Sequence, residues 1–555
     1  MDDVTDVLVI GAGPVGMTLA NELARRGVGF RIVDRAPGIR EVSKAMILHV
    51  RTQEALDKVG VAARARAEAQ PLTQVAVFAY GEPIGAWDLD AIDSPYRHPL
   101  ILGQNRTQHL LLDLLEQRGG RVEWNVEATA LALDAQGAQT TLAASDPATG
   151  RKQETRLRSR FVVGCEGSAS LVRKTLNVSF EGERYAGEQF IQADCRIEWA
   201  LPKGRSYLFL TADGYMMVIE FPDDVVRIFL SLPDHDAAGA RAAAAQLGAV
   251  EAADEPGLDE IAGHLTRLSG FACRLTAPRW RARYRTSHRY ANRFAQGRAF
   301  ICGDAAHVHV PIGGQGMNTG IQDAFNLGWK LAGVVKGELR ESVLPSYHDE
   351  RHPVAEQLIR GTDFAYTGLL HPSEARQRAI RLFGPFLVRN ERVQALVRGT
   401  LEELHVAYPA SPLNLDLGGA RGPKPGERVL DATLVRDADK ATVTLSELTR
   451  GEAWTLLLFS GLHPQADDTA ARAALAREIG ARFGARVAVF GVEAQAPAAP
   501  VAPAVALLDL LHEAHARYGV ADPGFALLRP DTYVGARGPL RQGAGLVDHL
   551  AGVFA

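Results

Sequence analysis

The 555-residue chain has few cysteines, little net charge and no long apolar run. Its cysteines, Cys165, Cys195, Cys273 and Cys302, lie far apart and form no Cys-x-x-Cys pair, which argues against a disulfide framework or a zinc site. The simplest interpretation is that they are small buried apolar residues in a reducing compartment. Residues 411–555 contain no cysteine, so thiol redox chemistry is excluded there.

The charges are balanced, with 61 Lys and Arg against 65 Asp and Glu, so no global positive field attracts nucleic acid or an anionic membrane. No segment approaches the ~18 apolar residues of a membrane span. The start, MDDVTD, is acidic where a signal peptide is basic. We therefore expect a cytoplasmic protein whose partner is a small molecule, and neither a nucleic acid nor a membrane. The length predicts roughly three to four folded units.

Residues 4–34, VTDVLVIGAGPVGMTLANELARRGVGFRIVD, have the pattern of a strand, a glycine turn, a helix and a second strand. Gly11 permits the tight turn, Gly13 lets the backbone approach a pyrophosphate, and Gly16 allows close packing of the helix. Asp34 ends the second strand, where a carboxylate accepts both ribose hydroxyls and disfavours a 2′-phosphate. This pattern predicts a site for FAD or NAD. No second GxGxxG follows a strand, so we expect the protein to hold one dinucleotide permanently and to bind any other only transiently.

Two further stretches have a strand that ends in a glycine and an acid: RFVVGCEGSASLVRKTL at Arg160–Leu176, and ICGDAAHVHVPIGGQGMNTGIQDAF at Ile301–Phe325. The second leads into an amphipathic helix, so its glycines favour a loop that turns backbone N–H groups toward an anionic ligand. His307 and His309 share one side of an extended segment and offer a metal site as the alternative. No adjacent residue supplies a third ligand. We expect His307 to be structural and assign no role to His309.

Together, GAGPVG with Asp34, then GCEGSASLVR, then GDAAHVHVPIGGQGMN resemble the single-component (class A) FAD-dependent aromatic hydroxylases. The resemblance covers about residues 4–360 and the tail with its closing LLRPDTYVGARG, and it is strongest to the phenol and polyketide hydroxylases of the pentachlorophenol monooxygenase type. It implies an α/β fold: a Rossmann-like FAD domain, an inserted substrate domain with an antiparallel sheet, and a thioredoxin-like C-terminal domain. The expected bounds are 1–75, 100–180 and 281–400 for the FAD domain, 76–99 and 181–280 for the substrate domain, and 411–555 for the third.

The resemblance also implies residues for a tightly bound, non-covalent FAD. Asp304 is expected at the ribityl chain, and the backbone N–H groups of Gly316, Met317 and Asn318 at the ring, where negative charge develops on reduction. Gln104 is expected to contact the flavin, with capping of the following helix as the alternative. Lys44 is expected near the pyrophosphate or else in solvent. The full set is Gly11, Gly13, Pro14, Val15, Gly16, Asp34, Arg35, Lys44, Gln104, Gly303, Asp304, Gly316, Met317 and Asn318.

On the substrate side, residues 205–233 have the pattern of short strands with period-2 stretches. Tyr207, Tyr215, Met217 and Phe229 are expected either to line an aromatic pocket or to belong to the sheet core.

The catalytic candidates each have an alternative. Arg227 approaches the flavin or forms a cross-strand salt bridge. His49 either accepts a phenol proton, for which the ordinary histidine pKa of about 6.5 is suitable, or has a structural role. Pro311 has no N–H and a fixed φ, and it is expected over the flavin ring.

The implied function is hydroxylation of a phenolic substrate with NADPH or NADH and O₂, through a flavin hydroperoxide. The alternatives are Baeyer–Villiger oxidation or epoxidation by the same intermediate, or a flavin-binding scaffold without turnover. Glu166 replaces the Asp that relatives usually have, which preserves charge, changes reach and makes direct contact with the cofactor doubtful. The sequence leaves open whether the protein forms a homodimer.

Overall fold

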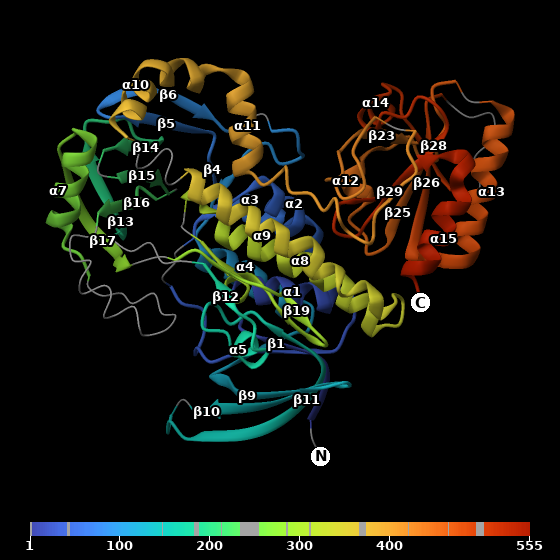
Figure 1. Ribbon diagram of the computed structural model, residues 1–555, viewed down its shortest axis with the longest axis horizontal. Coiled ribbons are helices and arrows are strands. Elements are labelled where there is room, and N and C mark those ends of the chain that lie inside the picture. Colours follow the sequence, from blue (N-terminus) through green and yellow to red (C-terminus); the bar gives the residue numbers. More distant parts are fainter. Residues whose placement is uncertain are drawn as a thin grey trace.

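The computed structural model describes residues 3–41, 45–90, 92–146, 148–182, 188–212, 214–221, 223–233, 255–284, 287–309, 312–365, 373–419, 421–463, 465–495 and 504–555. Lys44 and Pro311, both expected at the flavin, lie outside these ranges. The described residues are arranged around three large sheets (Figure 1).

The first sheet is built on β1 (Asp3–Ile10), whose apolar run is fully buried from Val7 to Val9. β1 lies between β2 (Phe30–Asp34) and β11 (Lys152–Gly164) and runs parallel to both. β20 (Ala299–Ile301) is parallel to β11, so the carboxyl ends of β1, β11 and β20 meet at one edge. Each of these ends leads into one of the glycine motifs. The Rossmann-like α/β fold is confirmed.

Helices cover this sheet, as a parallel sheet requires. α1 (Pro14–Arg25) connects β1 to β2, and the long α8 (Gln315–Val335) packs on it so closely that a Cβ on Gly328 would lie 2.7 Å from Cβ of Glu22. The other helices and strands of this part are α2 (Val50–Val59), α3 (Ala62–Glu68), α4 (Gln104–Gln117), α5 (Leu171–Thr175), α9 (Ser346–Ala365), β8 (Val122–Trp124), β9 (Val126–Asp134), β10 (Gly137–Ser145) and β19 (Ala295–Gln296). Two small sheets have the strand orders β3-β7-β4 and β12-β18-β21 and comprise β3 (Ile47–Leu48), β4 (Gln70–Pro71), β7 (Leu100–Ile101), β12 (Phe180–Glu181), β18 (Arg289–Ala291) and β21 (His307–Val308).

The second sheet has seven strands in the order β17-β13-β16-β15-β14-β5-β6. One face is covered by α7 (Leu258–Ser269), at the outer left of Figure 1, and the other faces the first part of the chain. α10 (Glu374–Arg389) and α11 (Glu391–Leu401) lie over its β6 end. The strands are β5 (Gln74–Ala79), β6 (Glu82–Asp88), β13 (Glu188–Trp199), β14 (Ser206–Thr211), β15 (Gly214–Glu220), β16 (Val226–Pro233) and β17 (Cys273–Tyr284).

The third sheet forms a separate C-terminal body, at the right of Figure 1, with strand order β22-β29-β28-β25-β26-β27-β23-β24. Its centre is β25 (Trp454–Phe459), which is buried along its whole length and pairs with β26 (Val487–Glu493) and β28 (Gly524–Leu528). The likeness of this body to thioredoxin stays a prediction. The other elements are β22 (Leu415–Asp416), β23 (Thr433–Arg436), β24 (Thr442–Thr444), β27 (Val505–Leu508), β29 (Val534–Pro539), α12 (Leu445–Leu448), α13 (Ala466–Phe483), α14 (Glu513–Tyr518) and α15 (Gly543–Val553).

Among the residues that the structure describes, no helix combines the length and the apolar character needed to cross a bilayer. The domain bounds given above stay a prediction. The strands nevertheless show why an insertion is needed, because β5 and β6 join the same sheet as β13 to β17 although α4 and β11 separate them in the chain.

The core between the second sheet and α7 supplies a stability test. Phe209 is 2% exposed and stacks on Phe78 at 4.8 Å, so Phe209→Ala should lower the free energy of unfolding by about 3–5 kcal/mol. Phe386 on α10 is 69% exposed, so Phe386→Ala should change the free energy of unfolding by less than about 0.5 kcal/mol. Denaturant unfolding of both variants measures the difference. Equal effects would contradict this assignment of core and surface.

Candidate functional site

The first glycine motif forms a tight turn after β1. Gly11 has a φ of +102°, and a Cβ there would lie 2.4 Å from the Cys165 carbonyl oxygen. A Cβ on Gly16 would lie 1.9 Å from the Gly11 carbonyl oxygen. Gly13 differs, because a Cβ there would meet nothing within 4 Å. Two of the glycines thus close the turn, while Gly13 leaves its outer side open to a ligand.

Asp34 lies beside this turn at the end of β2. Its carboxylate accepts hydrogen bonds from the Ala12 N–H at 2.7 Å and the Ala36 N–H at 2.8 Å. It therefore fixes the turn as well as presenting a negative charge next to it. Arg35, the next residue, is exposed. On the other side, the Gln108 side chain donates to the Ala12 carbonyl at 3.2 Å, a contact that the sequence did not suggest.

The third motif approaches the same place. Gly303 has a φ of +60° and lies against Val15, since a Cβ on Gly303 would lie 2.9 Å from Val15 Cγ2. Gly320 on α8 closes the contact, because a Cβ there would lie 2.8 Å from Val15 Cγ2 and 3.0 Å from Gly303 Cα. Asp304 follows in an exposed position. The structure thus brings the first and third motifs together, although about 290 residues separate them in the chain.

The start of α8 completes the site. Its N-cap is Gly314, which has no side chain to satisfy the first N–H groups of the helix, Gly316 and Met317 among them. Asn318 is fully buried, and its side chain bonds to the backbone: Nδ2 donates to the Ile47 carbonyl at 2.8 Å and to the Gly314 carbonyl at 2.9 Å. Its role is to hold the loop before the helix. The helix end therefore presents N–H groups and a positive dipole to a ligand.

The histidine pair is divided by the fold. His307 is buried and lies 2.7 Å, Nε2 to Oδ2, from the Asp323 carboxylate, which also accepts the Gly303 N–H at 3.1 Å. The structural role expected for His307 agrees with this geometry. His309 lies beside Gly316. Within the described part of the chain, no three His, Cys, Asp or Glu side chains gather as metal ligands.

His49 fits the structural alternative, because both of its ring nitrogens have partners within the protein. It is 2% exposed, with Nε2 at 2.7 Å from the Gly313 carbonyl oxygen and Nδ1 at 3.3 Å from Glu402 Oε1. Both partners are acceptors, so the geometry favours an imidazolium that donates twice. Burial lowers the pKa of His49, but Glu402 and Glu403 outweigh it and raise the pKa above its ordinary value. His49 links α2 to the Gly313 loop.

The four residues expected at the substrate divide between the two faces of the second sheet. Tyr215, Met217 and Phe229 lie on the face toward the glycine motifs, in one apolar cluster with Ile47. Phe229 packs on Tyr215 at 5.4 Å between ring centroids. Tyr207 is on the opposite face, under α7, because residues alternate along a strand. Tyr207 therefore fits the sheet-core alternative and not the pocket lining, because Leu208 and Leu210 occupy the inward positions of β14.

Arg227 lies on β16 directly opposite Asp194 of β13, and its Nε and Nη2 each donate to that carboxylate at 2.6 Å. The cross-strand ion pair is the alternative that the structure shows. Gln104 begins α4, and its Oε1 accepts the Ala45 N–H at 3.4 Å. Both residues thus have partners within the protein.

The second motif supports the other two loops. Glu166 turns inward, where its Oε1 accepts from Ser170 Oγ at 2.9 Å and the Val172 N–H at 3.0 Å, and burial raises its pKa. This position agrees with the doubt about direct contact with a cofactor. Arg173 donates from Nη1 to the Ala305 carbonyl at 2.9 Å, which ties the second motif to the third.

Sequence reasoning missed the pair that organises the centre of the site. Asp323 is fully buried in the middle of α8 and accepts from Arg351 Nε on α9 at 2.6 Å. Burial raises the pKa of Asp323, but Arg351 and His307 outweigh it, and the pKa lies below its ordinary value. The available signal was an acid in the middle of an amphipathic helix, close to Ile321 and Phe325 on its core face, since an acid is almost never buried unless it is paired.

These features fit a dinucleotide. The open side of Gly13, the carboxylate of Asp34 and the glycine-capped starts of α1 and α8 lie around one edge of the first sheet. An anionic pyrophosphate needs such N–H groups and an unobstructed backbone.

Comparison with known proteins points to the same chemistry. A family model described as FAD binding domain matches residues 4–362. The chain is 33% identical over 547 residues to the 6-methylpretetramide 4-monooxygenase of Streptomyces rimosus, covering 97% of this chain and 91% of that protein. It is 32% identical over 554 residues to the pentachlorophenol 4-monooxygenase of Sphingobium chlorophenolicum, covering 98% and 96%. The solved structure of an anhydrotetracycline hydroxylase from Streptomyces rimosus superposes with a TM-score of 0.72 at 27% identity, over 99% of both chains.

The contact of Gly320 with the third motif can be tested by adding one methyl group. Gly320→Ala overpacks against Val15 and Gly303, so we expect the affinity for FAD to fall by about tenfold. Gly263→Ala on α7 is the control, because a Cβ there meets nothing within 4 Å, and FAD affinity should not change. Fluorescence titration of FAD into the apoprotein measures both. Equal affinities in the two variants would contradict the close packing.

The raised pKa of His49 gives a pH-dependent contribution to stability. This contribution is complete below the unfolded-state pKa of about 6.5 and is lost as the pH rises through the higher folded-state pKa. We expect the difference in unfolding free energy between wild type and His49→Gln to be largest in mild acid and to shrink in alkali. Unfolding of both proteins at a series of pH values measures it. A difference that does not vary with pH would argue against the imidazolium.

Proposed function

Since the chain belongs to the FAD-binding monooxygenase family, whose model spans residues 4–362, we propose that it hydroxylates the ring of a phenolic substrate. It is an FAD-dependent monooxygenase, as its relatives over nearly the whole length are. The reductant is NADPH or NADH and the oxidant is O₂. The relative named pentachlorophenol 4-monooxygenase supports a phenol as substrate.

The observation that carries this proposal is the aromatic face of the second sheet that is turned toward the start of α8. Tyr215, Phe229 and Phe190 form a layer in which Phe190 and Phe229 lie 5.5 Å apart. Ile47, in the same apolar cluster, lies 3.3 Å from a Cβ placed on Gly314 at the start of α8. An apolar aromatic layer that reaches the loop of a flavin site suits a flat aromatic ring.

Each part of the site has a proposed role. Gly11, Gly13 and Gly16 with the start of α1 hold the pyrophosphate, and Asp34 holds the ribose. Asp304 holds the ribityl chain, and the N–H groups of Gly316, Met317 and Asn318 stabilise negative charge at the ring.

When bound, FAD supplies the transfer of electrons from the reductant to O₂ and of one oxygen atom to the ring. The protein excludes water and orients the substrate. The buried sheet face and the rigid start of α8 are suited to both tasks.

Two adjacent methionines on β15 allow a matched test. Met217 lies on the face toward the cofactor site, and Met216 lies on the α7 face. Met217→Ala should raise KM for the aromatic substrate by about tenfold, whereas Met216→Ala should lower thermal stability and leave KM unchanged. The assay follows NADPH or NADH oxidation with a panel of phenols and identifies the product. Absence of both phenol-stimulated oxidation and hydroxylated product would contradict the proposed function.

A further inference from the structure

The C-terminal body inserts one turn into the FAD-binding part. The turn joins β28 to β29 and comprises residues 529–533, Arg-Pro-Asp-Thr-Tyr, which we term the hairpin tip. It is closed by the Thr532 N–H donating to the Arg529 carbonyl at 3.1 Å and the Arg529 N–H to the Tyr533 carbonyl at 2.8 Å. Arg529, Asp531 and Tyr533 are at most 2% exposed. A turn normally lies at the surface, so its burial needs partners.

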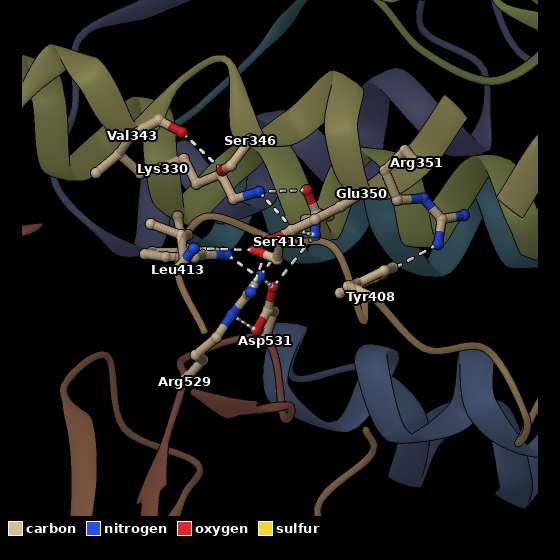
Figure 2. A network of polar contacts seen from close by, with 12 residues as sticks. Lys330, Val343, Ser346, Glu350, Arg351, Tyr408, Ser411, Leu413, Arg529 and Asp531 are labelled. Carbon is tan, nitrogen blue, oxygen red and sulfur yellow. Dashed lines mark hydrogen bonds and ion pairs between the residues drawn. The ribbon is translucent and has the colours of Figure 1, made fainter. Parts of the chain in front are cut away.

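The partners are charged residues of α8 and α9 (Figure 2). Arg529 holds the Glu350 carboxylate with two bonds, Nη1 to Oε1 at 2.6 Å and Nη2 to Oε2 at 2.8 Å. Lys330 Nζ donates to the same carboxylate at 2.7 Å, and burial lowers the pKa of Lys330 to about 8. Asp531 accepts from Trp329 Nε1 at 3.1 Å. These groups fix the tip against both helices.

A buried ion network contributes little net stability compared with an apolar core of the same shape, because desolvation offsets the attraction. Its directional bonds do fix relative positions, and bidentate Arg–carboxylate pairs do so most strictly. The arrangement is therefore better suited to setting geometry than to adding stability.

One route leads from the tip to the third glycine motif. Glu350, held by Arg529, is followed on α9 by Arg351, which donates from Nε to Asp323 at 2.6 Å and from Nη2 to the Thr319 carbonyl at 3.0 Å. Asp323 in turn accepts the Gly303 N–H at 3.1 Å. Asp304 directly follows Gly303 in the chain. Every step on this route is a direct hydrogen bond or one residue of chain.

A second route leads to the loop before α8. The Arg51 guanidinium lies 4.5 Å above the Tyr533 ring and donates to the Asp531 carbonyl at 3.1 Å. Arg51 is in the first turn of α2, whose N-cap is His49, and His49 contacts the Gly313 carbonyl. The two routes thus reach the Gly303–Asp304 turn and the loop before α8, the two segments that are expected to hold the ribityl chain and the ring of the flavin.

We propose that the hairpin tip is a positioning element for the cofactor. By fixing Glu350 and Arg51, it sets the Gly303–Asp304 turn and the Gly313 loop in the geometry that holds FAD. Arg529 and Glu350 are positioning residues, since neither contacts the cofactor loops directly. The C-terminal body is then part of the flavin site in function, although it contributes no residue to the loops themselves.

The test compares two ion pairs between the same parts of the full-length holoenzyme. Arg529→Met removes the buried pair with Glu350. Arg517→Met removes the pair of Arg517 with Asp93, whose 2.8 Å contact is at the surface with side chains 30% and 60% exposed. Arg529→Met should weaken FAD binding by about tenfold and alter the visible flavin spectrum, whereas Arg517→Met should change FAD affinity by less than about twofold. Arg529→Lys, which keeps the charge and loses the bidentate geometry, should lie between wild type and Arg529→Met.

Thermal unfolding separates positioning from stability. Wild-type FAD affinity and flavin spectrum in an Arg529→Met protein that melts at a lower temperature would overturn the proposal. If Arg529→Met does not fold, Tyr408→Phe examines the same route, because it removes only the hydroxyl that accepts from Arg351 Nη1 at 3.1 Å. This variant should bind FAD more weakly than wild type, and a lower melting temperature with wild-type FAD affinity would show a purely structural role. Unchanged affinity would overturn the proposal equally.

Discussion

Asp323 carries a carboxylate into the fully buried middle of α8, and the rest of the site is arranged to keep it charged. It has three partners: Arg351 on α9, and the His307 side chain and the Gly303 N–H, which both belong to the third glycine motif. An unpaired charge there would cost several kcal/mol. The pairing therefore obliges α8, α9 and the Gly303 turn to keep fixed relative positions, and Asp304 is positioned with them.

Close backbone packing acts together with this charge. Gly320 and Gly303 let α8 approach the turn so closely that neither position has room for a Cβ. Preorganised donors stabilise developing charge only if they do not have to move during the reaction. The start of α8 meets this condition, because Asn318 ties its loop to the strand that carries Ile47. The buried network at the hairpin tip extends the same principle to the C-terminal body.

The family, the α/β fold with its FAD site, and the enzymatic class follow from three short motifs and are confirmed. The domain bounds and the roles of individual residues stay predictions. Among the latter, Gly11, Gly16 and Gly303 occupy positions whose geometry requires glycine. Tyr207 and His49 occupy positions that fit their structural alternatives, in the sheet core and in a buried hydrogen-bonded link. The alternation of side chains along β14 follows from the sequence, but which of the two alternating sets faces inward depends on the pairing of β14 with β15. For His49, the deciding partners were Glu402 and Gly313, far away in the chain.

The amino-acid sequence by itself determined what is local: the buried strands, the glycine turns, the acid that ends each strand and the helix that starts after a glycine. These features depend on backbone sterics and periodicity, which act over a few residues. Only the tertiary structure decided which polar groups share a buried space. Arg529 with Glu350, and Asp323 with Arg351, are pairs between separate elements, and their charges are stable only once the surrounding elements exclude water and bring them into contact.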